Sequence, residues 1–360
     1  MNTTLHKYGL TPRFEQEATP YHPLYLARIT RQHRELYTVE CQEGELTAAV
    51  SGKLAHNASA QTDYPVVGDW VMIDRQSANT GNAVIHHILS RKTLLARQEA
   101  GSAAAQQAIA ANIDTIFICM SLNADFNLRR LERYLAIAWD SMATPVIVLT
   151  KADLCQNLPQ KMHQLLDVSV GVDTLYCSAQ NPQSLNALTA YVQPGTTVAF
   201  IGSSGVGKST LINRLMGTEV LHTQTIRQKD DRGRHTTTHR QLLALPGGGV
   251  VIDTPGMREL QIYTGNISKT FEDIEELAAL CKYSDCSHNT EPGCAIQAAI
   301  QNGNLPQKRY ESWQKLSREL TYSQLDSRQT ENEKISRMFG SKKEMKQFMA
   351  EVKHKNHRKL

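Results

Sequence analysis

A glycine-rich stretch has the residue types and spacing that bind phosphate. It reads Gly202, Ser203, Ser204, Gly205, Val206, Gly207, Lys208, Ser209 and then Thr210, which fits G-x-x-x-x-G-K-[ST]. Glycines let backbone N–H groups converge on phosphate oxygens, Lys208 would neutralise β- and γ-phosphate charge, and the Ser209 hydroxyl would coordinate Mg²⁺. An apolar run precedes the loop and helix-like residues follow it, which is the expected context. A glycine-rich turn with a surface lysine is the alternative.

A second motif predicts which base is bound. Thr150, Lys151 and Asp153 come directly after an apolar run, where an α/β sheet exposes its ligand-binding edge. A carboxylate there accepts from N1–H and the exocyclic amino group of guanine, whereas adenine would leave it unpaired. Lys151 would lay its stem along the base, and Ser178 and Ala179 could present a backbone N–H to guanine O6. Alone, K-x-D after a strand is more often a helix N-cap; the ordered set of motifs favours guanine.

The third element is Asp253 to Gly256, which follows the apolar residues 249–252. A carboxylate at a strand end beside a phosphate loop holds Mg²⁺, commonly through water, and the Gly256 N–H can meet the γ-phosphate. A D-x-P-G turn with no role is the alternative. The preceding residues 227–240 are polar and too long for a tight turn, and they suit a switch loop ordered by γ-phosphate and Mg²⁺.

A cysteine and histidine cluster predicts a metal site. Three thiols and an imidazole fall within fourteen residues, at Cys281, Cys286, His288 and Cys294. This set meets the four-coordinate Cys₃His demand of one Zn²⁺, and no ligand position is left open for water, so the role would be structural. Buried or redox-active cysteines are the alternative. The remaining cysteines, Cys41, Cys119, Cys155 and Cys177, are scattered singly, so the chain is not a disulfide framework.

Three regions of different pattern divide the 360 residues. Five short β-rich runs predict a small barrel, of which the OB-fold is one candidate and any five-stranded β module the alternative; they are 24–30, 36–40, 46–50, 70–73 and 83–89. From residue 113 to residue 253, strand-like and helix-like runs alternate, which predicts a parallel sheet with helices on both faces. Beyond residue 266 the strands stop, and residues 271–280 and 307–325 are predicted to be helical.

The order of the motifs indicates circular permutation. In the usual GTPase the phosphate loop comes first and the guanine motif last, but here residues 150–153 precede residues 202–209. The same sheet can form from a permuted chain, since domain termini lie on the surface and tolerate relocation. We therefore predict five segments: an N-terminal extension (1–22), an OB-fold barrel (23–97), a permuted GTPase domain (98–265), a mostly helical zinc-binding domain (266–340) and a basic tail (341–360).

The combination of a β-barrel, T-K-A-D, S-A, G-S-S-G-V-G-K-S-T, G-R-H-T-T-T, D-T-P-G and clustered Cys and His resembles the ribosome small-subunit-dependent GTPase A family. The likeness covers roughly residues 20–330. It implies an N-terminal OB-fold, GTP hydrolysis stimulated by the small ribosomal subunit and its rRNA as partner, a zinc-binding C-terminal domain, and a late role in small-subunit maturation. Thr150 departs from the family, in which most members carry Asn; we expect a modest loss of affinity and no change of base.

The catalytic residue is not the usual glutamine, because Met257 follows the D-x-x-G motif and has no donor. As the family's G-R-H-T-T-T implies, His235 is the candidate for orienting the attacking water. An RNA-facing or solvated loop histidine is the alternative. One of Thr236 and Thr237 is expected to bind Mg²⁺, and the sequence does not choose between them.

Charge and hydropathy limit the partners. The chain has 41% hydrophobic and 21% charged residues, and this composition argues against a disordered or fibrous protein. The net charge is only +4, but residues 341–360 carry seven Lys or Arg against two Glu, which suits RNA phosphates; a solvated tail is the alternative. Residues 1–95 hold nine basic and nine acidic residues, so RNA binding by the barrel depends on the resemblance and a local face around Arg28, Arg31 and Arg34.

The start of the chain lacks the apolar core of a secretory signal, and the longest apolar runs are strand-sized. We expect a soluble, cytoplasmic, monomeric GTPase without a membrane partner. Two rival functions stay open: a non-ribosomal guanine-nucleotide-dependent assembly or metal-delivery GTPase, which would lack salt-sensitive RNA association, and a non-catalytic nucleotide-binding adaptor, which multiple-turnover hydrolysis would exclude.

Overall fold

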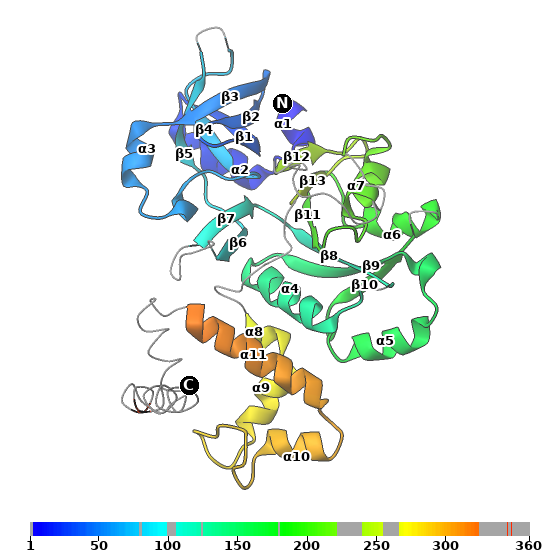
Figure 1. Cartoon of the computed structure of the whole chain (residues 1–360). Helices are drawn as coiled ribbons and strands as arrows, with labels where there is room; N and C mark the ends of the chain where they lie inside the picture. Colours follow the sequence, from blue (N-terminus) through cyan, green and yellow to red (C-terminus); the bar gives the residue numbers. More distant parts are fainter. Residues whose placement is uncertain are drawn as a thin grey trace, which may run out of the picture.

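A computed structural model describes residues 3–78, 81–98, 106–123, 125–178, 181–221, 240–254 and 266–323, together with residues 344 and 347. A β-barrel, a central α/β sheet and a group of C-terminal helices follow one another along the chain and in space (Figure 1). Within the described residues, no helix has the length and apolar character needed to cross a membrane.

The structure confirms the prediction of a small five-stranded β-barrel. Its strands are β1 (Tyr25–Gln32), β2 (Tyr37–Cys41), β3 (Gly44–Val50), β4 (Trp70–Ile73) and β5 (Ala83–Ile88). They pair in the order β1-β2-β3-β5-β4, and β4 returns to β1, which closes the barrel. The β3–β5 pair is parallel and the other pairs are antiparallel. Helices α3 (Gly52–Asn57) and η2 (Gln61–Asp63) connect β3 to β4.

Two short helices and a turn cover one side of the barrel. These are α1 (Thr3–Lys7), α2 (Pro12–Ala18) and η1 (Thr19–Tyr21). Leu5, Leu10 and Phe14 are buried against Trp70, whose ring centroid lies 5.6 Å from that of Phe14. Burying side chains of this size stabilises the fold by about 1.5–3 kcal/mol each, so this segment extends the barrel core.

The central sheet confirms the predicted α/β architecture. It contains β8 (Thr115–Ser121), β9 (Thr144–Thr150), β10 (Asp173–Cys177), β11 (Thr197–Gly202), β12 (Gln241–Ala244) and β13 (Val250–Asp253). The order is β10-β9-β8-β11-β13-β12, with five parallel strands and β12 antiparallel at the end. A separate hairpin, β6 (Leu94–Gln98) and β7 (Gln106–Ala111), precedes it.

Helices cover both faces of this sheet. On one face lie α4 (Leu128–Asp140), η3 (Ala152–Leu154) and α5 (Leu158–Leu166), and on the other η4 (Pro182–Leu185), α6 (Asn186–Thr189) and α7 (Lys208–Met216). Because side chains alternate along a strand, Ile116 and Ile118 of β8 enter the first core and Phe117 and Cys119 the second. The two buried layers hold the strand ends rigidly.

The C-terminal helices share a core with α4. They are α8 (Ile267–Thr270), α9 (Glu272–Ala279), α10 (Ala295–Gln301) and α11 (Gln307–Ser323). Phe271, Ile274, Ile296 and Leu316 are buried in the same cluster as Leu135 of α4. The helical part is therefore packed against α4, on the first face of the central sheet, through a continuous apolar contact (Figure 1).

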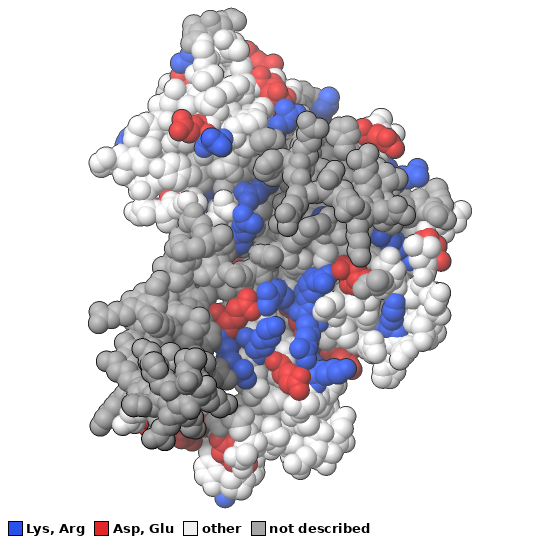
Figure 2. Space-filling model, in the orientation of Figure 1, with Lys and Arg blue, Asp and Glu red and all other residues white. Residues whose placement is uncertain are grey.

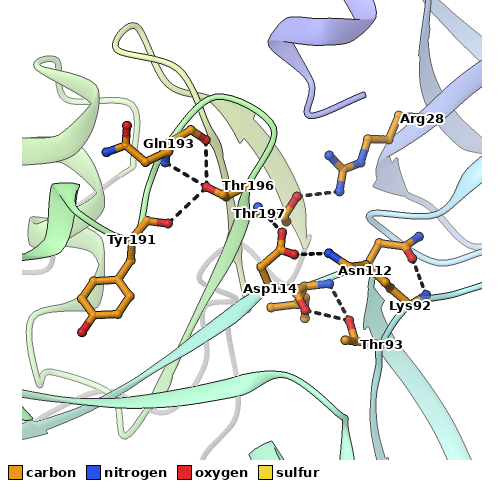
Figure 3. A network of polar contacts seen from close by, with 10 residues as sticks. Arg28, Lys92, Thr93, Asn112, Asp114, Tyr191, Gln193, Thr196 and Thr197 are labelled. Carbon is orange, nitrogen blue, oxygen red and sulfur yellow. Dashed lines mark hydrogen bonds and ion pairs between the residues drawn. The ribbon is translucent and has the colours of Figure 1, made fainter. Parts of the chain in front are cut away.

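A polar network joins the barrel to the sheet (Figure 3). Arg28 of β1 is 1% exposed and donates to Thr197 Oγ1 at 2.8 Å and to the Gly68 carbonyl at 3.3 Å. Asp114 accepts from the Thr197 N–H at 2.8 Å and pairs with Lys92. Burial lowers the pKa of Arg28 to about 10. The expectation that Arg28 contributes to an RNA-binding face is wrong, because its guanidinium is buried at this junction.

Candidate functional site

The predicted nucleotide motifs meet at one edge of the sheet. Parallel strands carry their carboxyl ends to the same side, which is where α/β sheets bind ligands. In register, Ser121 of β8 pairs with Thr150 of β9, and Gly202 of β11 pairs with Cys119 of β8. Asp253 pairs with Phe200 on the next strand. Residues 150 and 202, distant in sequence, therefore end the two strands on either side of β8, at one edge of the sheet.

The close contacts and backbone angles of the phosphate loop explain its glycines. Gly202 has φ +140°, and a Cβ there would lie 2.3 Å from the Cys119 carbonyl oxygen, so only glycine fits. Gly207, with φ +105°, is the N-cap of α7. Ser209 and Thr210 lie in the first turn of α7, whose backbone N–H groups and dipole favour an anion. The Lys208 ammonium bridges the loop by donating to the carbonyls of Gly202 at 2.7 Å and Ser203 at 2.8 Å.

The guanine motif is bound directly to the phosphate loop. Thr150 Oγ1 donates to the Val206 carbonyl at 2.5 Å, and Lys151 Nζ donates to the Gly205 carbonyl at 2.8 Å. Lys151 has φ +55°, which turns the chain sharply after β9. This contact shows what the hydroxyl of Thr150 does at the position where the family resemblance expects an amide: it braces the loop.

The carboxylate of Asp153 accepts from the Ser178 hydroxyl at 2.6 Å. Ser178 follows β10 and Asp153 follows β9, and these two strands pair in parallel. The structure therefore places the two predicted guanine-contact segments beside each other. Ala179 lies outside the described residues.

Asp253 ends β13 next to the phosphate loop. Burial raises its pKa and the Lys208 ammonium opposes that shift. The next residue, Thr254, is fully buried and donates from Oγ1 to the Phe200 carbonyl at 2.6 Å, which fixes where the chain leaves the sheet. Of the other predicted residues, His235, Thr236, Thr237 and Gly256 lie outside the described residues.

One contact with the phosphate loop was not anticipated from the sequence. Arg130 of α4 donates from Nη1 to Ser203 Oγ at 2.5 Å and to Asp125 Oδ1 at 2.5 Å. Tyr134, one helical turn later, also hydrogen-bonds Ser203, which opposes the rise that burial causes in its pKa. The available sequence signal was an arginine in the first turn of a helix, where the dipole disfavours a cation.

The predicted Cys₃His residues converge in the C-terminal part. The ligand atoms of Cys281, Cys286, His288 and Cys294 all lie within 4.8 Å of one another. Cys281 Sγ is 3.5 Å from His288 Nδ1 and 3.9 Å from Cys294 Sγ, and Cys294 Sγ is 3.7 Å from His288 Nδ1. Three thiols and an imidazole at these separations form a metal-binding cluster.

Local structure holds the cluster in place. Cys281 follows the end of α9, and Cys294 is the N-cap of α10, where it accepts from the Gln297 N–H. His288 has φ +58°, and its carbonyl accepts from Gln297 Nε2 and Tyr310 Oη, each at 2.7 Å. Burial and the neighbouring thiols raise the pKa of Cys286 to about 11; a bound cation reverses that preference by binding thiolates.

Together these features define a P-loop GTPase whose guanine motif precedes its phosphate loop, with a barrel and a metal-binding helical part attached. Comparison with family models agrees: the model described as RsgA GTPase matches residues 88–263. A second model, described as ABC transporter, matches residues 185–360. That stretch contains the phosphate loop common to many NTPases but neither the barrel nor the guanine motif at residues 150–153.

Similar proteins cover the whole chain. The "Small ribosomal subunit biogenesis GTPase RsgA 2" of Lactiplantibacillus plantarum is 53% identical, with 99% of this chain and 100% of that protein covered. The "Small ribosomal subunit biogenesis GTPase RsgA 1" of Listeria innocua is 43% identical over 88% of this chain and 90% of that protein. This chain belongs to the RsgA family of circularly permuted GTPases, which are GTP hydrolases.

Two solved structures share the fold. YjeQ from Thermotoga maritima is 26% identical, with a TM-score of 0.59, and the match covers 83% of this chain and 99% of that one. YloQ, described as a circularly permuted GTPase, has a TM-score of 0.58 at 23% identity, covering 83% of this chain and 96% of that one, and shows the fold alone.

Proposed function

We propose that this GTPase acts in small ribosomal subunit biogenesis: it binds the subunit and its rRNA, and its GTP hydrolysis is stimulated by the subunit late in maturation. The observation that carries the proposal is the single sheet edge on which a guanine motif and a phosphate loop meet, in a chain 53% identical over its length to a protein named for this process. Release of the protein would follow hydrolysis.

The nucleotide would be held by the residues of this edge. The Asp153 carboxylate accepts the two guanine N–H groups, Lys151 covers the base, and Ala179 supplies a backbone N–H to O6. The loop amides from Ser203 to Thr210 cradle the phosphates while Lys208 neutralises their charge. To do so, Lys208 exchanges its present carbonyl acceptors on Gly202 and Ser203 for phosphate oxygens.

Hydrolysis needs a water held in line and compensation of developing charge. Mg²⁺, when bound with GTP, would neutralise charge on the β- and γ-oxygens. Ser209, Asp253 and one of Thr236 and Thr237 supply oxygen donors of the kind Mg²⁺ prefers. We assign the water-orienting role to His235. The Gly256 N–H would donate a hydrogen bond to the γ-phosphate.

The metal we propose for the Cys₃His cluster is one structural Zn²⁺. Tetrahedral zinc with bonds of about 2.3 Å to sulfur and about 2.0–2.1 Å to nitrogen requires S···S near about 3.8 Å and S···N near about 3.6 Å. The separations among Cys281, His288 and Cys294, which are 3.9, 3.5 and 3.7 Å, support this fit. With four protein ligands, the ion would stabilise the fold rather than activate water.

GTP turnover by the purified chain tests this proposal, with and without small ribosomal subunits. Large subunits and ATP are the controls. We expect multiple turnover of GTP and none of ATP. We also expect that small subunits stimulate this turnover and that large subunits do not. Unstimulated turnover would instead favour a non-ribosomal assembly or metal-delivery GTPase, and absence of turnover a nucleotide-binding adaptor. Cytoplasmic location and a monomeric state complete the proposal.

A further inference from the structure

Helix α4 contacts the phosphate loop with one stripe of side chains. With another stripe it contacts the metal-binding part, which consists of helices α8 to α11 and the Cys₃His cluster. Arg130 and Tyr134, four residues apart, both reach Ser203. Arg129, Glu132 and Arg133 face α11 instead, through ion pairs described below. Residues three and four apart lie on one face of a helix, so the two sets occupy adjacent stripes of a single rigid element.

The sequence of α4 is locally unfavourable at its start. Asn127 is the N-cap and accepts from the Arg130 N–H, and the first turn contains two arginines and no acidic residue. A cation near a helix N-terminus opposes the macrodipole. Tertiary contacts must therefore offset this local preference, and both arginines have them.

On the phosphate side, the Arg130 guanidinium is held between Asp125 and Ser203. Ser203 is the residue directly after Gly202, and its carbonyl accepts from Lys208. Arg130 thus fixes the side chain of a residue whose backbone contacts the phosphate-binding lysine. A hydrogen bond from a charged donor is roughly twice as strong as a neutral one, which suits a positioning role.

On the other side, Arg309 of α11 links α4 to the metal-binding part. Its side chain is 6% exposed and donates to Glu132 at 3.1 Å, to Asp273 at 2.6 and 2.7 Å, and to the Thr270 carbonyl at 3.1 Å. Arg133 pairs with Glu319 at 2.6 Å. Basic and acidic side chains gather together where α4 and α11 lie (Figure 2).

We propose that α4 couples the phosphate loop to the metal-binding part, with Arg130 as the positioning residue for Ser203. The buried Glu132–Arg309 pair sets the placement of α4 against α11, and Arg130 passes that placement to the loop. By linkage, a nucleotide that changes the loop changes the stability of the α4–α11 contact, and a partner bound to the helices changes nucleotide affinity by the same factor. This inference concerns the chain alone and does not depend on a ribosomal partner.

The first experiment measures intrinsic GTP turnover and nucleotide affinity of the full chain, without ribosomes, for Arg130→Gln. Loss of positioning is expected to lower kcat about tenfold and to change the ratio of Kd for a non-hydrolysable GTP analogue to Kd for GDP by about fivefold. Partial unfolding would lower the amount of active protein but leave that ratio unchanged. The matched control is Arg129→Gln, whose exposed partner is Glu311; it should stay within about twofold of wild type.

The second experiment tests the coupling with a mutant cycle between the buried ion pair and Arg130. The double variant Glu132→Gln/Arg309→Met removes both buried charges together, which preserves folding. It is expected to lower kcat in the wild-type background and to cause no further loss of kcat in the Arg130→Gln background. Additive effects would overturn the coupling. Unchanged kcat and Kd ratio in Arg130→Gln, or equal losses in Arg129→Gln, would overturn the positioning role.

Discussion

Removal of Arg309 should destabilise the contact between α4 and the metal-binding part strongly and in a pH-dependent way. In Arg309→Met the apolar stem can still pack on Phe271, over whose ring the guanidinium lies at 4.9 Å. The charge is lost, however, and Glu132, whose side chain is 3% exposed, loses the guanidinium that lies 3.1 Å from its carboxylate. Taking one member from a buried ion pair costs about 3–5 kcal/mol.

The two carboxylates paired with Arg309 do not contribute equally. The Asp273 side chain is 42% exposed, so water replaces the lost guanidinium and the cost there is about 0–1 kcal/mol. Glu132 cannot be rehydrated in place. Most of the expected loss therefore comes from the one buried carboxylate.

The pH dependence follows from Glu132. Burial raises its pKa to about 7, although Ser312 and Arg309 oppose the shift, and removal of Arg309 raises that pKa further. A carboxyl group with a raised folded-state pKa stabilises the fold at low pH and loses that contribution as pH rises through the folded value. The variant should therefore lose less stability at pH 6, where Glu132 is protonated, than at pH 8.5.

Urea unfolding followed by tryptophan fluorescence measures this loss. A Trp70→Phe background leaves Trp139 and Trp313, which lie in α4 and α11, as the reporters. Arg129→Met is the matched control, because its pair with Glu311 is about half exposed and is expected to contribute about 0–1 kcal/mol. Glu132→Gln/Arg309→Met should recover most of the loss. A loss below about 1 kcal/mol at both pH values, or a double variant as unstable as the single one, would refute the reasoning.

Three further predictions concern the sites. Gly202→Ala should weaken GTP binding about 100-fold, because its Cβ would lie 2.3 Å from the Cys119 carbonyl. Gly205→Ala carries the backbone strain of φ +78° but its Cβ meets no atom within 4 Å, so it should lose less affinity in the same titration. Asp153→Asn should weaken GTP binding about 10- to 100-fold and narrow the preference for GTP over ATP in competition binding, since an amide cannot accept both guanine N–H groups. An unchanged preference for GTP over ATP would contradict the guanine assignment. Cys294→Ser should lower metal content and expose the C-terminal helices to protease, as a chelator should in wild type, while Cys155→Ser, outside the cluster, should do neither.

The predicted elements with strong local patterns were found in the structure. β4 (Trp70–Ile73) has the predicted bounds, because it is a fully apolar run between Asp69 and Asp74. The helix predicted over residues 271–280 is found as α9, which spans Glu272–Ala279. The sequence did not indicate the β6–β7 hairpin or β12, which are short and mix polar with apolar residues. Their strand conformation depends on strand pairing, of β6 with β7 and of β12 with β13 and β1.

The candidate sites were predictable to the extent that motif residues carry their own chemistry. Backbone geometry requires glycine at Gly202 and metal coordination requires the four cluster ligands, so both can be read from types and spacing. Contacts between parts of the chain that are distant in sequence could not be predicted. Arg28 was expected to face RNA, yet its guanidinium is buried against Thr197, 169 residues away. A single arginine carries no sequence signal of its partner.

Strand β11 connects these observations. Its first residue, Thr197, accepts from Arg28 of the barrel, and the residue after its last, Ser203, accepts from Arg130 of α4. In an unpermuted GTPase the phosphate-loop strand would come first in the domain, whereas here it follows β8, β9 and β10 in the chain and lies between β8 and β13 in the sheet. Charged contacts from the barrel and from α4 therefore hold the strand at its first residue and just beyond its last. Because packed sheets resist deformation, a displacement of either attached part would act on the phosphate loop through β11.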